Sequence, residues 1–398
     1  MAKIMDLITF NDTKSCAPLL GLLVRLAESM SMHRHPSLFP EMPNYEGLNR
    51  IKIWTTIAFI DVMSSVSSCL PLLIRNEDHD VFPYSTTGRS PSTEDSARLQ
   101  VTSITGEVSE AQMLLSEALP LASSIVATAN SVKSEYTYDQ VESTDKTLRH
   151  ILNMLSKINM DDGLDAFSLQ GLMLQRAMLQ IFIRRMLLIL HEPFARDSKS
   201  SASHTSSRFA VMECSLSLLH CHSKLSEAAT LGNPVQWFLN FFKEDFGIAT
   251  IYVARAIRRN DFDTDAQVLP HTCPKEIVWT ALRQSTEIFE AHAADSVNHF
   301  RIYMGSVYLL AALESLQSGC PMLDKMIEAG RTIIRIIHTK KGKEVSDMDL
   351  SPPDESISKV GTSSSPDETD DASRDWARVG YDPLCFDEES QSSRGLFS

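Results

Sequence analysis

The chain has 398 residues, 43% of them hydrophobic, which is enough for one large core or for roughly two to three ordinary domains. Its formal net charge of −14 argues against a surface that binds nucleic acid through phosphate neutralisation alone. The seven cysteines are scattered and odd in number, unlike a secreted disulfide scaffold. The most apolar stretch, residues 169–190, contains three arginines, so no membrane span is expected. We expect a soluble, intracellular protein.

Apolar residues recur at helical spacing along most of the chain. In the first such stretch, residues 15–32, one apolar stripe is predicted from Leu19, Leu23, Leu26, Ala27 and Met30. The same period predicts helices near 45–70, 107–132, 138–159, 164–192, 205–229, 234–259, 274–292, 296–317 and 321–340. Breakers separate them, including Pro193, Gly232-Asn-Pro234 and Gly319-Cys-Pro321. The expected fold class is all-α, a multi-helix bundle over residues 1–344.

The composition changes from Val345 onward. Residues 345–398 hold thirteen acidic and four basic residues, and too little apolar area remains there to offset chain entropy. We expect this segment to be a disordered acidic tail. Trp376, Phe386 and Phe397 lie among its charges, a composition found in activation segments and also in plain solvated disorder.

Three short segments between residues 17 and 84 are similar to motifs of one protein family. The first runs from Arg25-Leu-Ala to His33-Arg34-His-Pro, where Ser31 and His35 replace the family's usual Gly and Asp. The second has Arg50 and Trp54, with Asp61 seven residues after the tryptophan. Together they resemble the fungal-specific transcription factor domain family, the helical regulatory region of zinc-cluster transcription factors.

The third segment completes this resemblance. Pro71 follows Asp61 by ten residues and leads into an acidic turn with Asp78 and Asp80, while Cys69-Leu70 replaces the family's Gly-Arg pair. A weaker match, Leu-His191-Glu-Pro193-Phe, resembles the family's Leu-His-Arg-Pro-Phe helix end. In the family a binuclear zinc cluster precedes this region, but no Cys-x-x-Cys occurs here, so we expect that module to be absent.

The motif residues also have a structural interpretation. Arg34 and Arg50 offer forked donors that could meet Asp61, Asp78 or Asp80 and hold a loop against two helices. Arg25, His33, Trp54, Pro71, His191 and Pro193 are likewise expected to be structural rather than catalytic.

Other reactive residues support no specific chemistry. A metal site near His33 and His35, or at Cys214, His220, Cys221 and His222, is disfavoured because helix positions two apart diverge by about 200°. No hydrolase, nucleotide-binding or metalloprotease motif is present, so we expect no cofactor, no metal and no catalytic residue. The basic residues 340–343 fit a helix C-terminus better than a nuclear import signal.

The resemblance implies a nuclear transcriptional regulator, in such proteins often one of a fungal secondary-metabolite gene cluster. Its partners would be the transcription machinery or a DNA-binding partner protein, with no direct nucleic-acid binding, no membrane and an unknown small-molecule effector. Two alternatives stay open: a small-molecule-binding helical module without transcriptional output, and an enzyme without local motifs.

Overall fold

The structure is a computed structural model that describes residues 13–81, 110–158, 166–196, 204–229, 233–259 and 275–340. Eleven α-helices and two short 3-10 helices make up these residues, which contain no strand, so the all-α prediction is confirmed. The α-helices are α2 (Thr13–Ser29), α3 (Asn44–Ser68), α4 (Glu110–Ala129), α5 (Tyr138–Ser156), α6 (Ala166–Arg196), α7 (Thr205–Ala229), α8 (Asn233–Phe241), α9 (Lys243–Arg259), α10 (Lys275–His292), α11 (Val297–Ser318) and α12 (Met322–Lys340). The 3-10 helices are η1 (Pro36–Leu38) and η2 (Asn76–Asp78).

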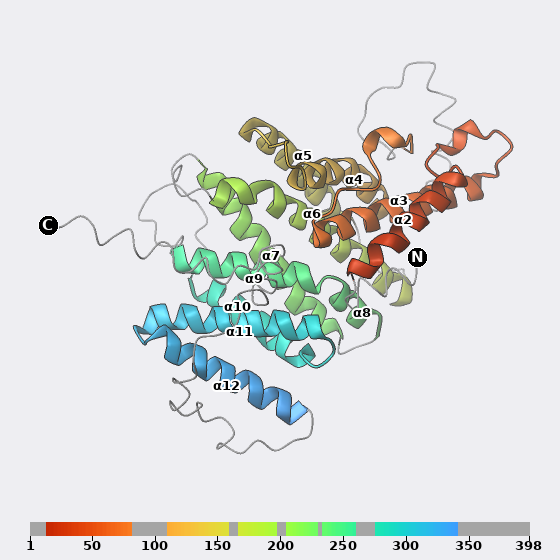
Figure 1. Cartoon of the computed structure of the whole chain (residues 1–398). Coiled ribbons are helices and arrows are strands. Elements are labelled where there is room, and N and C mark those ends of the chain that lie inside the picture. The colour runs from red at the N-terminus through yellow and green to blue at the C-terminus, as the bar shows by residue number, and fades with distance from the viewer. Residues whose placement is uncertain are drawn as a thin grey trace, which may run out of the picture.

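The helices follow one another across the molecule (Figure 1). At one end α2 packs on α3, α3 on α4, and α4 on α5 and α6. In the middle α6 packs along α7, and α7 also contacts α8, α9 and α10. At the other end α11 packs on α10 and α9, and α12 covers α11. The chain is thus a succession of helix pairs with α6 and α7 at its centre.

Helix α6 explains why the most apolar stretch of the chain is not a membrane span. Its side chains from Leu179 to Leu190 are almost all buried, with Leu179, Phe182 and Met186 completely so. Each such aliphatic or aromatic side chain contributes about 1.5–3 kcal/mol when it is removed from water. Because α4, α5 and α7 surround this helix, it has no wide polar face. No helix in the described ranges is long and apolar enough to cross a membrane.

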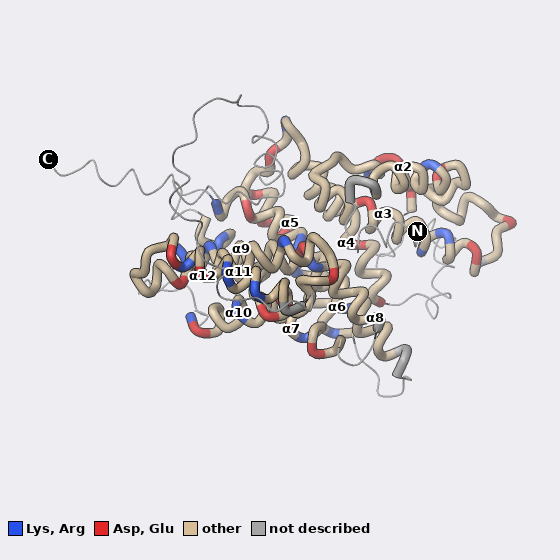
Figure 2. Tube along the Cα trace, turned by 60° about the horizontal axis from the view of Figure 1, so that its bottom comes forward, with Lys and Arg blue, Asp and Glu red and all other residues tan. Residues whose placement is uncertain are grey.

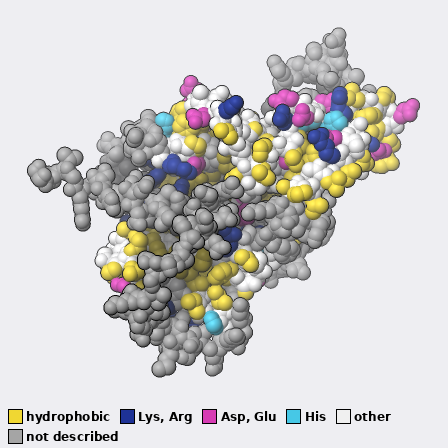
Figure 3. All heavy atoms as spheres, in the orientation of Figure 1, with side chains coloured by type: hydrophobic (Ala, Val, Ile, Leu, Met, Phe, Trp, Pro, Cys, Tyr) yellow, Lys and Arg dark blue, Asp and Glu magenta, His cyan; other side chains and the backbone are white. Residues whose placement is uncertain are grey.

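The predicted apolar stripe of the first helix is wrong in phase. The buried residues of α2 are Cys16, Leu20, Val24 and Ala27, and only Ala27 was predicted. Leu26 and Met30 are 53% and 55% exposed. The α2 sequence is apolar on more than one side, so periodicity alone left the choice of face open. Hydrophobic side chains consequently lie on the outer surface at the α2–α3 end (Figure 3).

Two helices end in the left-handed conformation without a glycine. After α2, Ser31 has φ 55°, and the Met32 N–H donates to the Ala27 carbonyl at 3.0 Å, the pattern of a Schellman cap. After α3, Cys69 has φ 53°. A left-handed turn redirects the chain most readily at glycine, because any Cβ is strained there. At both positions this chain has another residue where the resembled family has glycine.

Only some of the helix boundaries expected at glycine and proline residues are found in the structure. Gly319 caps α11 with φ 69°, as expected from Gly319-Cys-Pro321. Pro193 does not end α6, which continues to Arg196, so that boundary is wrong. Proline costs a helix one backbone hydrogen bond, and burial of the surrounding apolar side chains outweighs it here. The single helix predicted over 234–259 is two, α8 and α9, with a break at Phe242.

Helices α3 and α4 are held together by a polar contact as well as by packing. The Asn130 side-chain amide, just after α4, donates to the Ser65 carbonyl at 3.1 Å and to the Leu70 carbonyl at 2.7 Å. The Asn76 side-chain amide donates to the Pro120 carbonyl at 3.0 Å. The Ser65 carbonyl lies in the last turn of α3, where carbonyl groups have no partner within the helix, so the Asn130 amide satisfies it.

Candidate functional site

Asp80 connects the turn after α2 with the turn after α3. The Arg34 guanidinium forms an ion pair with the Asp80 carboxylate at 3.1 Å, one of the pairings considered from the sequence. The backbone N–H of His35 donates to Asp80 Oδ1 at 2.6 Å, and the Asp80 N–H donates to the His33 carbonyl at 3.2 Å. These contacts join the turn after α2 to the turn after α3, so the first and third motif segments meet in space.

Trp54 lies in the centre of this assembly. Its side chain is 2% exposed, and its ring packs between His33 and His79, with centroid distances of 6.0 and 5.8 Å. Trp54 Nε1 and the Nδ1 atoms of both histidines are buried without a hydrogen-bond partner among the described residues. Trp54, His79 and Asp61 also line a space of about 430 Å³ between α3, α4 and the 71–81 turn. Burial lowers the pKa of His79, although the neighbouring Asp80 and Asp78 act to raise it. The neutral form of the His79 ring is therefore favoured.

The Asp61 carboxylate binds backbone N–H groups rather than an arginine side chain. Its Oδ2 accepts hydrogen bonds from the N–H groups of Leu73 at 3.0 Å and Ile74 at 2.9 Å. Burial raises the pKa of Asp61 to about 6, although these two donors pull it down. Asp61 therefore fixes the turn that follows Pro71 against the middle of α3.

The pairing proposed for Arg50 with an aspartate is wrong. Arg50 donates to the Met30 carbonyl at 2.9 Å and pairs with Glu46 at 3.3 Å, one helical turn before it. It thus covers a carbonyl at the end of α2, where the last turn leaves such groups without helical partners. Arg25 is exposed and pairs with Glu28 at 2.8 Å, outside the Trp54 assembly. Asp78 is the last residue of η2 and is exposed, as is Pro71.

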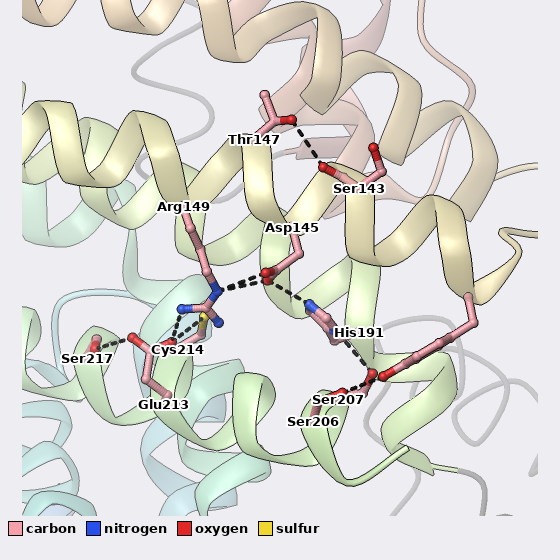
Figure 4. Close-up of polar contacts among 11 residues, drawn as sticks. Ser143, Asp145, Thr147, Arg149, His191, Ser206, Ser207, Glu213, Cys214 and Ser217 are labelled. Atoms are coloured by element: carbon pink, nitrogen blue, oxygen red, sulfur yellow. Dashed lines mark hydrogen bonds and ion pairs between the residues drawn. The ribbon is translucent and has the colours of Figure 1, made fainter. Parts of the chain in front are cut away.

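The motif residue His191 lies at a second polar site, the junction of α5, α6 and α7 (Figure 4). His191 of α6 contacts Asp145 Oδ1 through Nε2 at 2.9 Å and Ser207 Oγ through Nδ1 at 3.0 Å. Asp145 also accepts from Arg149 Nε at 2.9 Å, and Arg149 reaches Glu213 at 3.0 Å. A continuous polar chain therefore runs from Ser207 to Glu213 across three helices.

The charges of this chain fix the direction of its hydrogen bonds. Burial acts to raise the pKa of Asp145, but the His191 hydrogen bond and the charge of Arg149 outweigh it and hold that pKa below its usual value. An ionised carboxylate only accepts, so His191 carries a proton on Nε2. In the neutral ring Nδ1 then accepts from the Ser207 hydroxyl.

Serine, histidine and aspartate stand here in the order of a hydrolase triad, but the serine is closed off. Ser207 is 0% exposed and His191 is 5% exposed, so no substrate carbonyl reaches the Ser207 hydroxyl in this arrangement. The network satisfies buried polar groups between three helices. Sequence analysis found His191 but missed Asp145, Ser207 and Arg149, and the available signal was a histidine inside an apolar run that would need partners once buried.

The remaining reactive residues form no evident centre. His222 is buried, contacts Ser285 Oγ at 2.8 Å and stacks on Phe246 with a centroid distance of 4.4 Å, whereas His220 is exposed. Within the described ranges, no group of three or more His, Cys, Asp or Glu side chains is arranged to hold a metal ion. Trp376, Phe386 and Phe397 lie outside the described residues.

Comparison with known proteins identifies relatives of this chain. The chain is 22% identical over 333 residues to transcription factor lepE of Aspergillus flavus, an alignment that covers 78% of this chain and 39% of lepE. The chain is a relative of fungal transcription factors. It is 24% identical over 240 residues to the pyrrolocin cluster transcription factor fsdR of a fungal species, covering 58% of this chain and 31% of fsdR.

A shorter match is to a protein whose name states the zinc-cluster class. The chain is 37% identical over 62 residues to the Zn(2)-C6 fungal-type transcription factor pigI of Monascus ruber, covering 16% of this chain and 8% of pigI. The longer matches to lepE and fsdR confirm the resemblance to fungal transcription factors. No protein family profile and no solved structure matches the chain. The chain spans about two fifths of the length of relatives such as lepE.

Proposed function

We propose that this chain is a regulatory region that controls transcription of a fungal secondary-metabolite gene cluster through protein contacts, in the nucleus. The observation that carries the proposal is the alignment with lepE over 78% of the chain, which includes most of the helical core. The name of fsdR refers to a metabolite cluster, which supports the finer assignment. The buried setting of Ser207 and His191 favours a structural role for the polar network over catalysis.

The charge distribution favours protein partners over DNA. Lys and Arg are interspersed with Asp and Glu along the described helices in Figure 2, rather than gathered on one long face. Binding to duplex DNA draws most of its free energy from basic side chains placed against successive phosphates. With a formal net charge of −14, this chain would reach DNA through a partner protein or through a DNA-binding segment outside this sequence.

A tethering assay tests the proposal. The full chain is fused to a heterologous DNA-binding domain in a fungal host that carries the matching reporter, and transcription is compared with the DNA-binding domain alone. We expect a clear rise in reporter transcripts from the fusion. A fusion that is expressed in the nucleus at the same level and leaves the reporter unchanged would contradict the proposal. In parallel, the purified chain should not bind cluster promoter fragments, and salt-sensitive binding at nanomolar concentration would contradict the protein-contact mechanism.

A further inference from the structure

A pocket rich in arginine lies where α6 and α9 end and α7 begins. About 370 Å³ of space lies between its lining atoms, part of it open to solvent. Four arginines line it together with the Tyr252 ring and one carboxylate, that of Glu192. The arginines are Arg196, Arg208, Arg255 and Arg259. The lining side chains thus carry an excess of three positive charges in a chain whose net charge is strongly negative.

Contacts within the protein account for three of the four arginines. Glu192 pairs with Arg196 and, at 3.5 Å, with Arg255, which also lies over the Tyr252 ring at 5.6 Å. Arg259 donates to the Ala195 carbonyl at 3.0 Å and so covers the end of α6. One carboxylate shared by two guanidinium groups leaves the described lining of the pocket with a net positive charge.

Arg208 is the arginine that such contacts do not explain. It comes from the second turn of α7, and its Nε is buried without a hydrogen-bond partner among the described residues. A buried guanidinium N–H without an acceptor costs free energy, and three more arginines nearby add repulsion. Burial raises the pKa of Tyr252 to about 12, so its hydroxyl stays protonated as a further donor. The pocket therefore offers donors and positive charge but few acceptors.

We propose that this pocket binds a small dianion, a phosphate group or a dicarboxylate, with Arg208 as its principal contact. The planar fork of a guanidinium donates two parallel hydrogen bonds to phosphate or carboxylate oxygens. A dianion would also relieve the repulsion among the four arginines. The pocket opens to solvent, which suits a compact ion or the charged end of a larger molecule. This inference does not depend on the proposed transcriptional function.

Calorimetric titration of the purified full chain tests the proposal. Inorganic phosphate and succinate are titrated separately at a constant ionic strength set with sodium chloride, so the two arms distinguish phosphate from dicarboxylate. In Arg208→Gln we expect binding of the preferred ion to weaken at least about tenfold, the usual loss when a charge-assisted bidentate contact is removed. Arg208→Lys keeps the charge without the fork and should weaken binding by a smaller factor. Arg25→Gln, an exposed arginine far from the pocket in the fold, is the control and should bind within about twofold of the unaltered chain.

No binding of either ion, or equal affinity in Arg208→Gln and Arg25→Gln, would overturn the proposal. If Arg208→Gln unfolds at the assay temperature, Arg255→Gln provides the same test from α9. A further variant replaces Asp261, Asp263 and Asp265, which closely follow Arg259 in the sequence, with Asn. We expect this variant to bind the anion like the unaltered chain. A tenfold gain in affinity would mean that these aspartates, rather than a dianion, neutralise the pocket.

Discussion

Asp145 on α5 and His191 on α6 share a hydrogen bond of 2.9 Å although 46 residues separate them in the chain. Asp145 also accepts a hydrogen bond from Arg149 on its own helix, and His191 contacts Ser207 on α7. The contact lies between helices that also pack against one another, so it adds to an apolar interface rather than replacing it.

Asp145→Asn should lower the free energy of unfolding by about 2–3 kcal/mol, because it removes the charge that Arg149 and His191 both contact. Urea denaturation at pH 7 measures the loss. Asp139→Asn, an exposed aspartate on the same helix, should change stability by less than about 0.5 kcal/mol. Equal small losses in both variants would show that the network contributes little.

Trp54→Ala should cost about 3–5 kcal/mol, the range for truncating a buried aromatic side chain. The structure confirms that Trp54 is buried, with an exposed fraction of 2%. Trp54→Phe should cost clearly less, because it keeps most of the ring contacts and removes an N–H that has no partner among the described residues. Thermal or urea unfolding distinguishes the two, and a loss below about 1 kcal/mol in Trp54→Ala would contradict the burial.

Ser31→Gly and Cys69→Gly should each stabilise the protein by about 0.5–1 kcal/mol, because both positions have φ near 55°. The gains should add, since the two sites cap different helices. Ser29→Gly is the matched control: Ser29 is the last residue of α2, and glycine should be neutral or destabilising there. Destabilisation by Ser31→Gly would mean that its side chain contributes more than its backbone strain costs.

The sequence predicts the existence and order of the helices well, because long stretches with apolar residues every three or four positions are specific to helices. It predicts contacts between distant segments less well. Arg34 does meet Asp80, but Arg50 covers the Met30 carbonyl, a partner without any side-chain signature. The Asp145–His191 contact was missed because spacing in the chain says nothing about which helices pack together. Likewise, Pro193 stays helical because packing around it outweighs a local rule.

His222→Gln should change how stability depends on pH. Burial, together with the nearby His292 and His299, lowers the pKa of His222 to about 3, whereas in the unfolded chain it is about 6.5. The unfolded state therefore gains a proton as the pH falls below 6.5 and the folded state does not, so this contribution to stability is full above pH 6.5 and declines in acid.

The stability difference between the unaltered protein and His222→Gln should consequently shrink by about 2 kcal/mol from pH 7 to pH 5. Urea unfolding at pH 7, 6 and 5 measures it. A constant difference for His222→Gln would show that folding leaves the pKa of His222 near its usual value.

Deletion of residues 345–398 should leave the thermal transition of the remainder nearly unchanged and abolish reporter output in the tethering assay. The acidic composition of this segment predicts little contribution to a folded core, but its aromatic side chains would supply most of the affinity for a partner groove. Replacing Trp376, Phe386 and Phe397 together with Ala keeps the charge and should have the same effect on the reporter. Unchanged reporter output from the triple variant would leave the tail without an activation role.

The contact of α3 with α4 has a practical consequence for handling the protein. Asn130 and Asn76 each donate to a carbonyl across the boundary between residues 13–81 and the rest of the fold, and the two helices also pack directly. A protease cut between residues 82 and 109 would therefore yield two polypeptides that stay associated. Such a nicked sample would elute from a sizing column like the intact chain and separate only on a denaturing gel, so integrity has to be judged by the gel.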